Sequence, residues 1–394
     1  MTSGWPPVAW EERPWTSVDD GESRRRQFAA RGPYAAAVPP RIAELDLPVL
    51  DPGLIVDAED AVVALARFDA EVSGITAPFA SILLRSESSS SSEIEQLTAS
   101  PKSIALAELG LRSGPNSQLI LANRRAMEAA IALSGDLDED AILAMQHALL
   151  HETHPEFTGR WRQQPVWVGG RSNSPHTATF VPPHSDRVPG LMADLTAFAR
   201  RADLAVLPQI AIAHAQFETI HPFPDGNGRT GRALVHAMLH RLRITRSVVV
   251  PVSAGLLGDV QTYFAALGAY RQGDVGPIVA AFADACIAAV ANGRQLVSDV
   301  VEFRSRAYDI ATARRGSAGW RTIELLTQQP VISAREVALV LGVTPQNAQN
   351  GIDRLVADGI LVPAGSSRRN RLYLAEEILA ALDSFAQRAR RRSS

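Results

Sequence analysis

Apolar residues recur at the three- and four-residue spacing of a helix face through most of this chain. In the segment 57–72, for example, Ala61, Leu65 and Phe68 fall on one side of a helix. The same spacing predicts helices over about residues 116–134, 137–151, 187–201, 204–219 and 229–243, and several more within 256–313. The chain is therefore predicted to be mainly α-helical.

Residues 166–181 follow a different pattern. Val166–Val168 and Thr177–Val181 have the composition of short strands, and Gly169 and Gly170 between them favour a turn. We therefore expect a short β-hairpin there.

Residues 316–385 have the pattern of a winged helix-turn-helix domain. Ser333 and Glu336 form a capping box that starts one helix, and Gly342 is a turn residue after it. Thr344 begins a second helix that runs to about residue 358. Two short strands complete the pattern, at 360–363 and 371–374.

The length of 394 residues, 46% of them hydrophobic, allows two or three domains. Residues 1–55 are rich in proline, tryptophan and charge, which indicates an extended arm. We divide the chain into an N-terminal arm and helix, a helical core, a winged helix-turn-helix and a basic tail. The predicted bounds are 1–75, 76–315, 316–385 and 386–394.

The formal net charge of −3 gives no overall attraction to nucleic acid or to a membrane surface. Cys286 is the single cysteine, which excludes an internal disulfide and a thiolate metal cage; its apolar neighbours predict a small core residue. We find no signal segment and no apolar span of 18 residues. The expectation is a cytoplasmic protein with no membrane partner.

Lysine is nearly absent, since Lys102 is the only one among 39 basic residues. A P-loop needs a lysine after a glycine-rich turn, and a protein kinase needs one on its third strand. Lys102 has no glycine near it. Both of these nucleotide-binding arrangements are therefore excluded.

The segment after the helix predicted at 204–219 suits a phosphate group. His221 comes at the end of that helix because Pro222 cannot extend it. The sequence Gly226-Asn-Gly228 allows a tight turn at the start of the next helix. Inward-pointing amides at a helix start bind anions, so this turn is a candidate phosphate site.

Charged residues beside the turn strengthen that hypothesis. Arg229 and Arg232 are three positions apart, so both can reach one anion from the same helix face. Asp225 can bind a magnesium ion that also holds phosphate oxygens. The alternative is an ordinary helix-turn-helix whose arginines lie on the surface and bind no phosphate.

Residues 226–231 also match the dinucleotide fingerprint G-x-G-x-x-G. That fold needs a strand before the loop and an acidic residue about 20 positions later. Here the preceding segment has a helical pattern, and 251–255 is Pro-Val-Ser-Ala-Gly. We therefore regard the match as a coincidence.

The twelve residues from His221 to Arg232 resemble the signature H-P-F-x-[DE]-G-N-G-R-x-x-R of Fic domain proteins, with every specified position met. The resemblance implies a helical core in which two helices bracket the loop. It also implies that His221 is the general base and that Asp225 holds Mg²⁺. The nucleotide-binding residues implied are Phe223, packed beneath the loop, Gly226, Asn227 and Gly228 around the α- and β-phosphates, and Arg229 and Arg232 at the phosphate tail.

By the same resemblance, the reaction transfers AMP from ATP to a Ser, Thr or Tyr hydroxyl of a target protein or of the chain itself. An imidazole that titrates near neutral pH can take the hydroxyl proton. The magnesium ion and the arginines would stabilise the leaving pyrophosphate. Kinase-like relatives depart from the Gly-Asn-Gly-Arg core that this chain keeps at 226–229, which favours adenylyl transfer.

The segment Ser91-Ser-Glu-Ile-Glu95-Gln96 resembles the inhibitory motif [ST]-x-x-x-E-[GN] of one Fic subclass, and predicts an inhibitory helix at about 86–100. The resemblance implies that Glu95 pairs with Arg232 and keeps that arginine from the γ-phosphate. Gln96 departs from the usual Gly or Asn. The alternative is a serine-rich linker that leads into an ordinary helix.

Two further segments suggest partners. The hairpin at 166–181 resembles the flap with which Fic enzymes pair a target strand, and an ordinary structural hairpin is the alternative. Residues 320–374 could bind DNA through the arginines of the wing, or bind a protein instead. A second copy of the chain, as a homodimer, is another candidate partner.

Several histidines have weaker signals. His214 lies seven positions before His221 and is expected to pack rather than react. His236 and His240 have a metal-like spacing but no evident third ligand, so we expect hydrogen-bonded histidines there.

The sequence thus predicts a Mg²⁺- and ATP-dependent protein adenylyltransferase, restrained by Glu95, with a mainly α fold, a β-hairpin flap and a C-terminal winged helix. Two alternatives stay open. One is a DNA-binding regulator whose core senses nucleotide without turnover. The other is removal of AMP from a modified protein, with Glu95 positioning the water.

Overall fold

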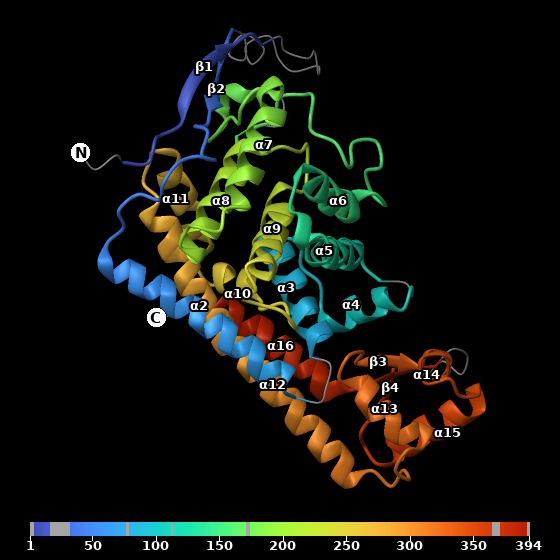
Figure 1. Ribbon diagram of the computed structural model, residues 1–394. Coiled ribbons are helices and arrows are strands. Elements are labelled where there is room, and N and C mark those ends of the chain that lie inside the picture. Colours follow the sequence, from blue (N-terminus) through green and yellow to red (C-terminus); the bar gives the residue numbers. More distant parts are fainter. Residues whose placement is uncertain are drawn as a thin grey trace. The chain divides into compact units, whose positions relative to one another are not determined.

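The computed structural model describes residues 4–15, 32–75, 79–111, 113–170, 174–364 and 371–391, and this part of the chain is mainly helical, as predicted (Figure 1). The predicted wing-tip arginines Arg368 and Arg369 and the end of the basic tail lie outside the described residues. The chain divides into two compact units. The first unit comprises 1–62, 125–243 and 260–284, and the second comprises 63–124, 244–259 and 285–394.

The first unit combines a two-stranded antiparallel ribbon with a group of helices. The ribbon pairs β1 (Ala9–Arg13) with β2 (Tyr34–Val38). The helices are α6 (Glu139–Leu150), α7 (Val188–Ala199), α8 (Val206–Ile220), α9 (Asn227–Arg241) and α11 (Val260–Arg271). Three single-turn 3₁₀ segments accompany them, at Ser134–Asp136, Pro175–Thr177 and Ser185–Arg187.

Helices α8 and α9 form the interior of the first unit. Every residue of α8 from Leu207 to Ile220 is buried, and so is nearly all of α9 from Asn227 to Leu239. A helix that is covered on all sides belongs in the core of a domain. Close approach of the two helices depends on Gly231, because a Cβ there would lie 2.8 Å from Glu218 Oε1 and 2.9 Å from Phe217 Cδ1.

The second unit contains the remaining elements. Its helices are α3 (Ala80–Ile94), α4 (Pro101–Glu108), α10 (Val252–Gly258), α13 (Ala318–Leu326), α14 (Ala334–Leu341), α15 (Pro345–Ala357) and α16 (Glu376–Arg390). Its strands are β3 (Val331–Ser333), β4 (Val362–Ala364) and β5 (Leu372–Leu374), antiparallel in the order β3-β5-β4. Helices α2 (Pro52–Ser73), α5 (Pro115–Ala132) and α12 (Gly276–Ile310) contribute residues to both units.

The helix start and end signals predicted within 316–385 are present in the second unit. Ser333 Oγ accepts the backbone N–H of Glu336 at 3.1 Å, and α14 ends at Gly342 with a positive φ of 64°. Thr344 Oγ1 caps α15 by accepting the N–H of Asn347 at 3.3 Å. Local capping therefore fixes where these helices begin and end.

One expectation about α12 is wrong. The helix has an 18-residue window long and apolar enough to span a membrane by length and composition alone, although we expected no such span. Half of that window is buried within the protein, as in a core helix of a globular fold. Cys286 lies on this helix, and burial raises its pKa to about 12, which fits the predicted role as a small core residue.

Candidate functional site

The phosphate-loop candidate begins where α8 ends. His221 is the C-terminal cap of α8 in the left-handed conformation, with φ 51° and ψ 61°, and its N–H bonds to Phe217 O at 2.9 Å. The left-handed region is uncommon for any residue except glycine and asparagine. A histidine held there is a local strain that the surrounding structure has to support.

Arg162 supplies that support. Its Nε donates to His221 O at 2.8 Å, and its own backbone N–H donates to Pro222 O at 3.0 Å. Its Nη2 donates to Pro183 O at 2.5 Å and to Ile220 O at 3.3 Å. Burial lowers the pKa of Arg162 to about 10, so the guanidinium stays charged at neutral pH. Sequence reasoning missed this residue, because no local motif around it signals contact with a loop 59 positions later.

Asn227 closes the loop from the other side. Its Oδ1 accepts the N–H of Phe223 at 2.9 Å, and its Nδ2 donates to Phe223 O at 2.8 Å. Phe223 is fully buried and packs against Trp161, with ring centroids 5.2 Å apart. The side chain of Asn227 therefore bonds within the loop and fixes its shape, and Phe223 packs beneath the loop.

Gly226 begins α9 in a conformation that a larger residue would strain. Its φ is 81°, and a Cβ would lie 2.9 Å from Leu149 Cδ2 and 3.2 Å from Leu150 Cδ1. The carbonyl of Gly226 accepts the N–H of Thr230 at 2.9 Å, which starts the helix. The first-turn amides of a helix have no acceptor within it, so this end of α9 suits an anion.

The loop brings charged side chains of both signs together. Arg229 and Arg232 are buried, whereas the Asp225 side chain is 54% exposed and lies 3.7 Å from Arg229 Nη2. Asp225 Oδ1 also accepts the N–H of Gly226 at 2.7 Å. Glu218 Oε2 lies 3.9 Å from His221 Nδ1, a carboxylate that the motif did not indicate. The i, i+3 spacing of Glu218 and His221 on α8 was the available signal.

The residues present fit a magnesium ion that is bound chiefly by phosphate. Among the described residues, no group of three or more His, Cys, Asp or Glu side chains could hold a metal ion. Magnesium usually takes one or two protein carboxylates and completes its shell with phosphate oxygens and water. The exposed carboxylate of Asp225 at the start of α9 has the chemistry that such a ligand requires.

The other histidines have structural surroundings. His214 is buried beside α9, and its Nε2 lies 2.8 Å from Tyr263 Oη. Burial lowers the pKa of His214 to about 3, so the ring is neutral and packs, as expected. His240 Nδ1 lies 2.8 Å from Ser134 Oγ, and His236 is 3% exposed.

Comparison with known proteins identifies this region. Residues 136–239, which include the loop and both helices around it, match the Fic/DOC family. The chain carries a Fic domain. A protein adenylyltransferase Fic from Nematostella vectensis is 29% identical over 152 residues, which are 38% of this chain and 32% of the relative. A protein adenylyltransferase from Caenorhabditis elegans is 31% identical over 153 residues, 37% of this chain and 27% of the relative.

The matched segments span about a third of the length of these curated relatives. A crystal structure of a Fic family protein from Desulfovibrio desulfuricans G20 has a TM-score of 0.51 to this chain at 23% identity. That similarity covers 84% of this chain and 98% of the other. The helical fold around the Fic domain is therefore shared well beyond the matched sequence.

The hairpin expected beside the Fic loop is reduced to one antiparallel bridge in the described residues. Val168 N–H bonds to Phe180 O at 2.8 Å, and Thr179 N–H bonds to Val168 O at 2.9 Å. Residues 171–173, near the predicted turn, lie outside the described residues.

The segment expected to inhibit the Fic domain forms a helix, but with different bounds. Helix α3 covers Ala80–Ile94 rather than about 86–100, and its serine-rich stretch is largely buried. Ser91 is fully buried within α3, and Glu95 is its C-terminal cap.

Gln96 follows the cap at φ 63°, the left-handed conformation. Leu97 N–H bonds to Ser92 O at 3.0 Å and Gln96 N–H to Glu93 O at 2.8 Å, which is the Schellman pairing of a helix end. This geometry explains why a Gly or Asn would suit position 96, where this chain has Gln.

Proposed function

We propose that this protein is an ATP- and Mg²⁺-dependent protein adenylyltransferase that transfers AMP to a hydroxyl side chain of a target protein or of itself. The main support for this proposal is the loop geometry, because Arg162 holds His221 in a left-handed turn directly before the start of α9. Two relatives of the Fic domain are themselves named protein adenylyltransferases, which supports the same reaction class.

In this proposal the target hydroxyl attacks the α-phosphate of ATP while the His221 imidazole takes its proton. A bond forms between the hydroxyl oxygen and the α-phosphorus, and the bond to the bridging oxygen breaks, so that pyrophosphate leaves. The α9 amides with Arg229 and Arg232 stabilise the charge on the phosphates. Asp225 would hold a magnesium ion, which would supply further positive charge at the leaving group.

We also propose that Glu95 restrains this reaction by pairing with Arg232. This rests on the motif and on the place of Glu95 at the exposed end of the buried helix α3. The segment around Val168 and Phe180 would receive a strand of the target by main-chain pairing. A cytoplasmic location belongs to the same proposal.

Transfer is tested by incubating the full chain with α-labelled ATP and Mg²⁺ and measuring label on protein. Losing a general base costs about 10²–10⁴ in rate, so the label should vanish in His221→Ala. The matched control is His154→Ala, because that exposed histidine lies outside the loop. Equal labelling of the His221→Ala variant and the wild type would refute the assigned role.

The direction of transfer needs its own experiment. In the forward reaction, Glu95→Gly increases labelling because the restraint is gone. If the protein instead removes AMP from a modified target, Glu95→Gly abolishes release. Release from an AMP-modified protein and labelling of an unmodified one, measured on the same variant, separate the two.

DNA binding through 320–374 is a second candidate function, favoured by the polar face of α15. Gln346, Asn347 and Asn350 are exposed there, and carboxamides suit base edges. The order α13-β3-α14-α15-β4-β5, with β5 central in the sheet, supports the winged-helix assignment. A duplex affinity that falls with salt and with Asn347→Ala would support this function, and an affinity unchanged by either would oppose it.

A further inference from the structure

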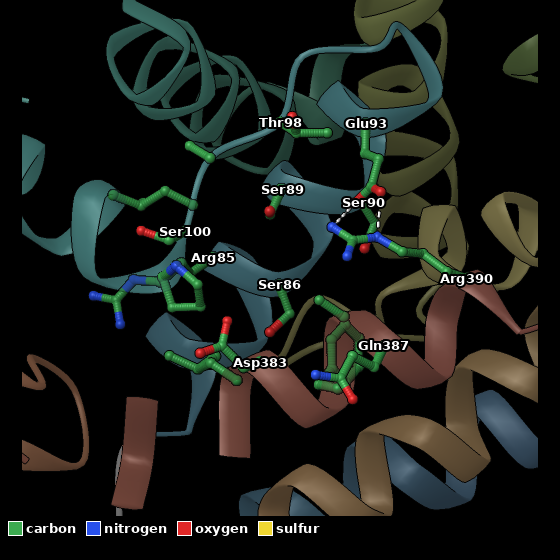
Figure 2. Close-up of a pocket in the computed structure, with 16 residues that line it drawn as sticks. Arg85, Ser86, Ser89, Ser90, Glu93, Thr98, Ser100, Asp383, Gln387 and Arg390 are labelled. Atoms are coloured by element: carbon green, nitrogen blue, oxygen red, sulfur yellow. Dashed lines mark hydrogen bonds and ion pairs between the residues drawn. The ribbon is translucent and has the colours of Figure 1, made fainter. Parts of the chain in front are cut away.

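A cavity of about 470 Å³ lies in the second unit between α3, the start of α4 and α16 (Figure 2). Its size is within the range of small-molecule sites, about 300–1,000 Å³. Figure 2 shows Ser86 on α3 beside Asp383 and Gln387 of α16, with Ser89 further along α3. Nothing in the proposed transfer reaction uses this cavity.

The charges around the cavity are unequally neutralised. Arg85 is buried and pairs with Glu108 at 2.5 Å, and Arg390 pairs with Glu93 at 2.5 Å. Among the described residues, Asp383 has no ion-pair partner within 4.0 Å. Burial raises the pKa of Asp383, while Arg390 acts in the opposite direction. Asp383 is therefore the lining carboxylate with which a positively charged ligand group could pair without displacing an ion-pair partner.

The rest of the lining offers hydroxyls and an apolar wall. Ser90 is 4% exposed and lines the cavity, and neither Ser89 nor Ser90 makes a side-chain hydrogen bond to another described residue. Leu382 and Phe385 supply apolar surface from α16. Buried hydroxyls gain most from a ligand that hydrogen-bonds to them.

We propose that this cavity binds a small molecule with one ammonium group and several hydroxyls, of the amino-sugar class. The ammonium group pairs with the Asp383 carboxylate, and the ligand hydroxyls bond to Ser89 and Ser90. Phosphate esters do not fit this chemistry, because both basic groups of the lining already have carboxylate partners.

The position of the cavity connects it to the proposed restraint. Glu93 and Thr98 both line it, so the turn that contains Glu95 and Gln96 is bounded on each side by lining residues. Arg390 holds the last turn of α3 through Glu93, and a ligand hydroxyl that hydrogen-bonds to Glu93 competes with Arg390 for that carboxylate. Occupying the cavity therefore loosens the segment that carries Glu95. This step rests on the proposed function, whereas binding itself does not.

Binding is tested by calorimetry on the full chain with three probes that share one sugar ring: glucosamine, glucose and glucose 6-phosphate. Glucosamine should bind, glucose should bind at least about tenfold more weakly, and glucose 6-phosphate should not bind. Asp383→Asn should lower the affinity for glucosamine about tenfold and leave the affinity for glucose unchanged. The control is Asp60→Asn, an exposed aspartate on α2. Equal affinity for glucosamine and glucose, or no heat with glucosamine at millimolar concentration, overturns the site.

The link to transfer is tested by labelling with ATP in the presence of glucosamine. The Arg390 side chain of this ion pair is half exposed, which weakens the pair, so we expect a modest rise in labelling of about two- to fivefold in the wild type. The rise should be absent in Glu95→Gly and in Asp383→Asn. Glucosamine that binds without changing the rate of labelling overturns the link. Absence of label in every variant, Glu95→Gly included, is instead a failure of the proposed transfer, and the calorimetric result alone then decides whether the site exists.

Discussion

Replacing Arg162 with lysine tests how the fold positions His221. The guanidinium donates to four carbonyl oxygens, those of Ile220, His221, Gln164 and Pro183, and no ammonium group can reproduce that arrangement. A buried acceptor left without a donor costs about 1–3 kcal/mol. If lysine satisfies two of the four acceptors, two are left without a donor, and the free energy of unfolding should fall by about 2–6 kcal/mol.

The same substitution should affect transfer more than nucleotide binding. His221 would keep its identity but lose its fixed orientation, and a displacement of about 1 Å in a reacting group can cost about 10² in rate. We expect the rate of AMP transfer to fall by about that factor, while ATP affinity changes by less than about threefold, because the α9 amides are intact. Both quantities are measured on the same folded preparation.

The matched control is Arg160→Lys, since Arg160 is exposed two positions earlier and should tolerate the change. Denaturant unfolding gives the stability, and labelling at saturating ATP gives the rate. An Arg162→Lys variant with wild-type stability and wild-type transfer would show that His221 does not depend on this guanidinium.

Three further predictions concern single residues. Gly226→Ala should lower the free energy of unfolding by about 1–3 kcal/mol, because its Cβ meets Leu149 and its φ is positive; an unchanged denaturation midpoint would contradict this. Gln96→Gly should raise stability by up to about 1 kcal/mol by relieving a left-handed backbone, and a loss would argue against strain at that turn. His214 has a folded pKa of about 3 against an ordinary value of 6.5, so it favours folding fully above pH 6.5 and progressively less as pH falls toward 3. The unfolding free energy of wild type should therefore fall more steeply below pH 6.5 than that of His214→Gln, and parallel curves would exclude this titration.

Helix periodicity was enough to locate the central helices of the first unit. The segments predicted at 187–201, 204–219 and 229–243 correspond to α7, α8 and α9 within a few residues. Prediction succeeded there because proline and glycine set the ends: Pro222 stops α8, and Gly226 starts α9 with a positive φ.

The sequence was less informative where tertiary contacts override local preference. A run of serines at 88–92 favours loops and helix ends, yet it lies within the buried helix α3. The hydroxyls of Ser86 and Ser88 donate hydrogen bonds to the carbonyls of Ile82 and Leu84, one turn earlier. These bonds satisfy the hydroxyls, so both serines are tolerated inside a buried helix. Helix α3 ends at Ile94 in a Schellman turn. Such turns usually contain a glycine, and because this one has Gln96 instead, the sequence did not indicate the helix end.

Sequence reasoning identified the site residues that are adjacent along the chain and missed a contact from a distant residue. The motif identified the loop residues, because they are adjacent along the chain. Arg162 reaches the same loop from 59 residues away, and its contacts are all with backbone carbonyls, which carry no sequence signal. Glu218 was within reach of pattern reasoning, because it stands one helical turn before His221.

A crystal structure of the full chain with Mg²⁺ and a non-hydrolysable ATP analogue tests the central claim directly. We predict that the triphosphate lies against the backbone N–H groups of Gly228 and Arg229, with Asp225 on the metal ion and the His221 ring beside the α-phosphate. A triphosphate bound elsewhere, or one with the His221 ring turned away from its α-phosphate, would contradict the account.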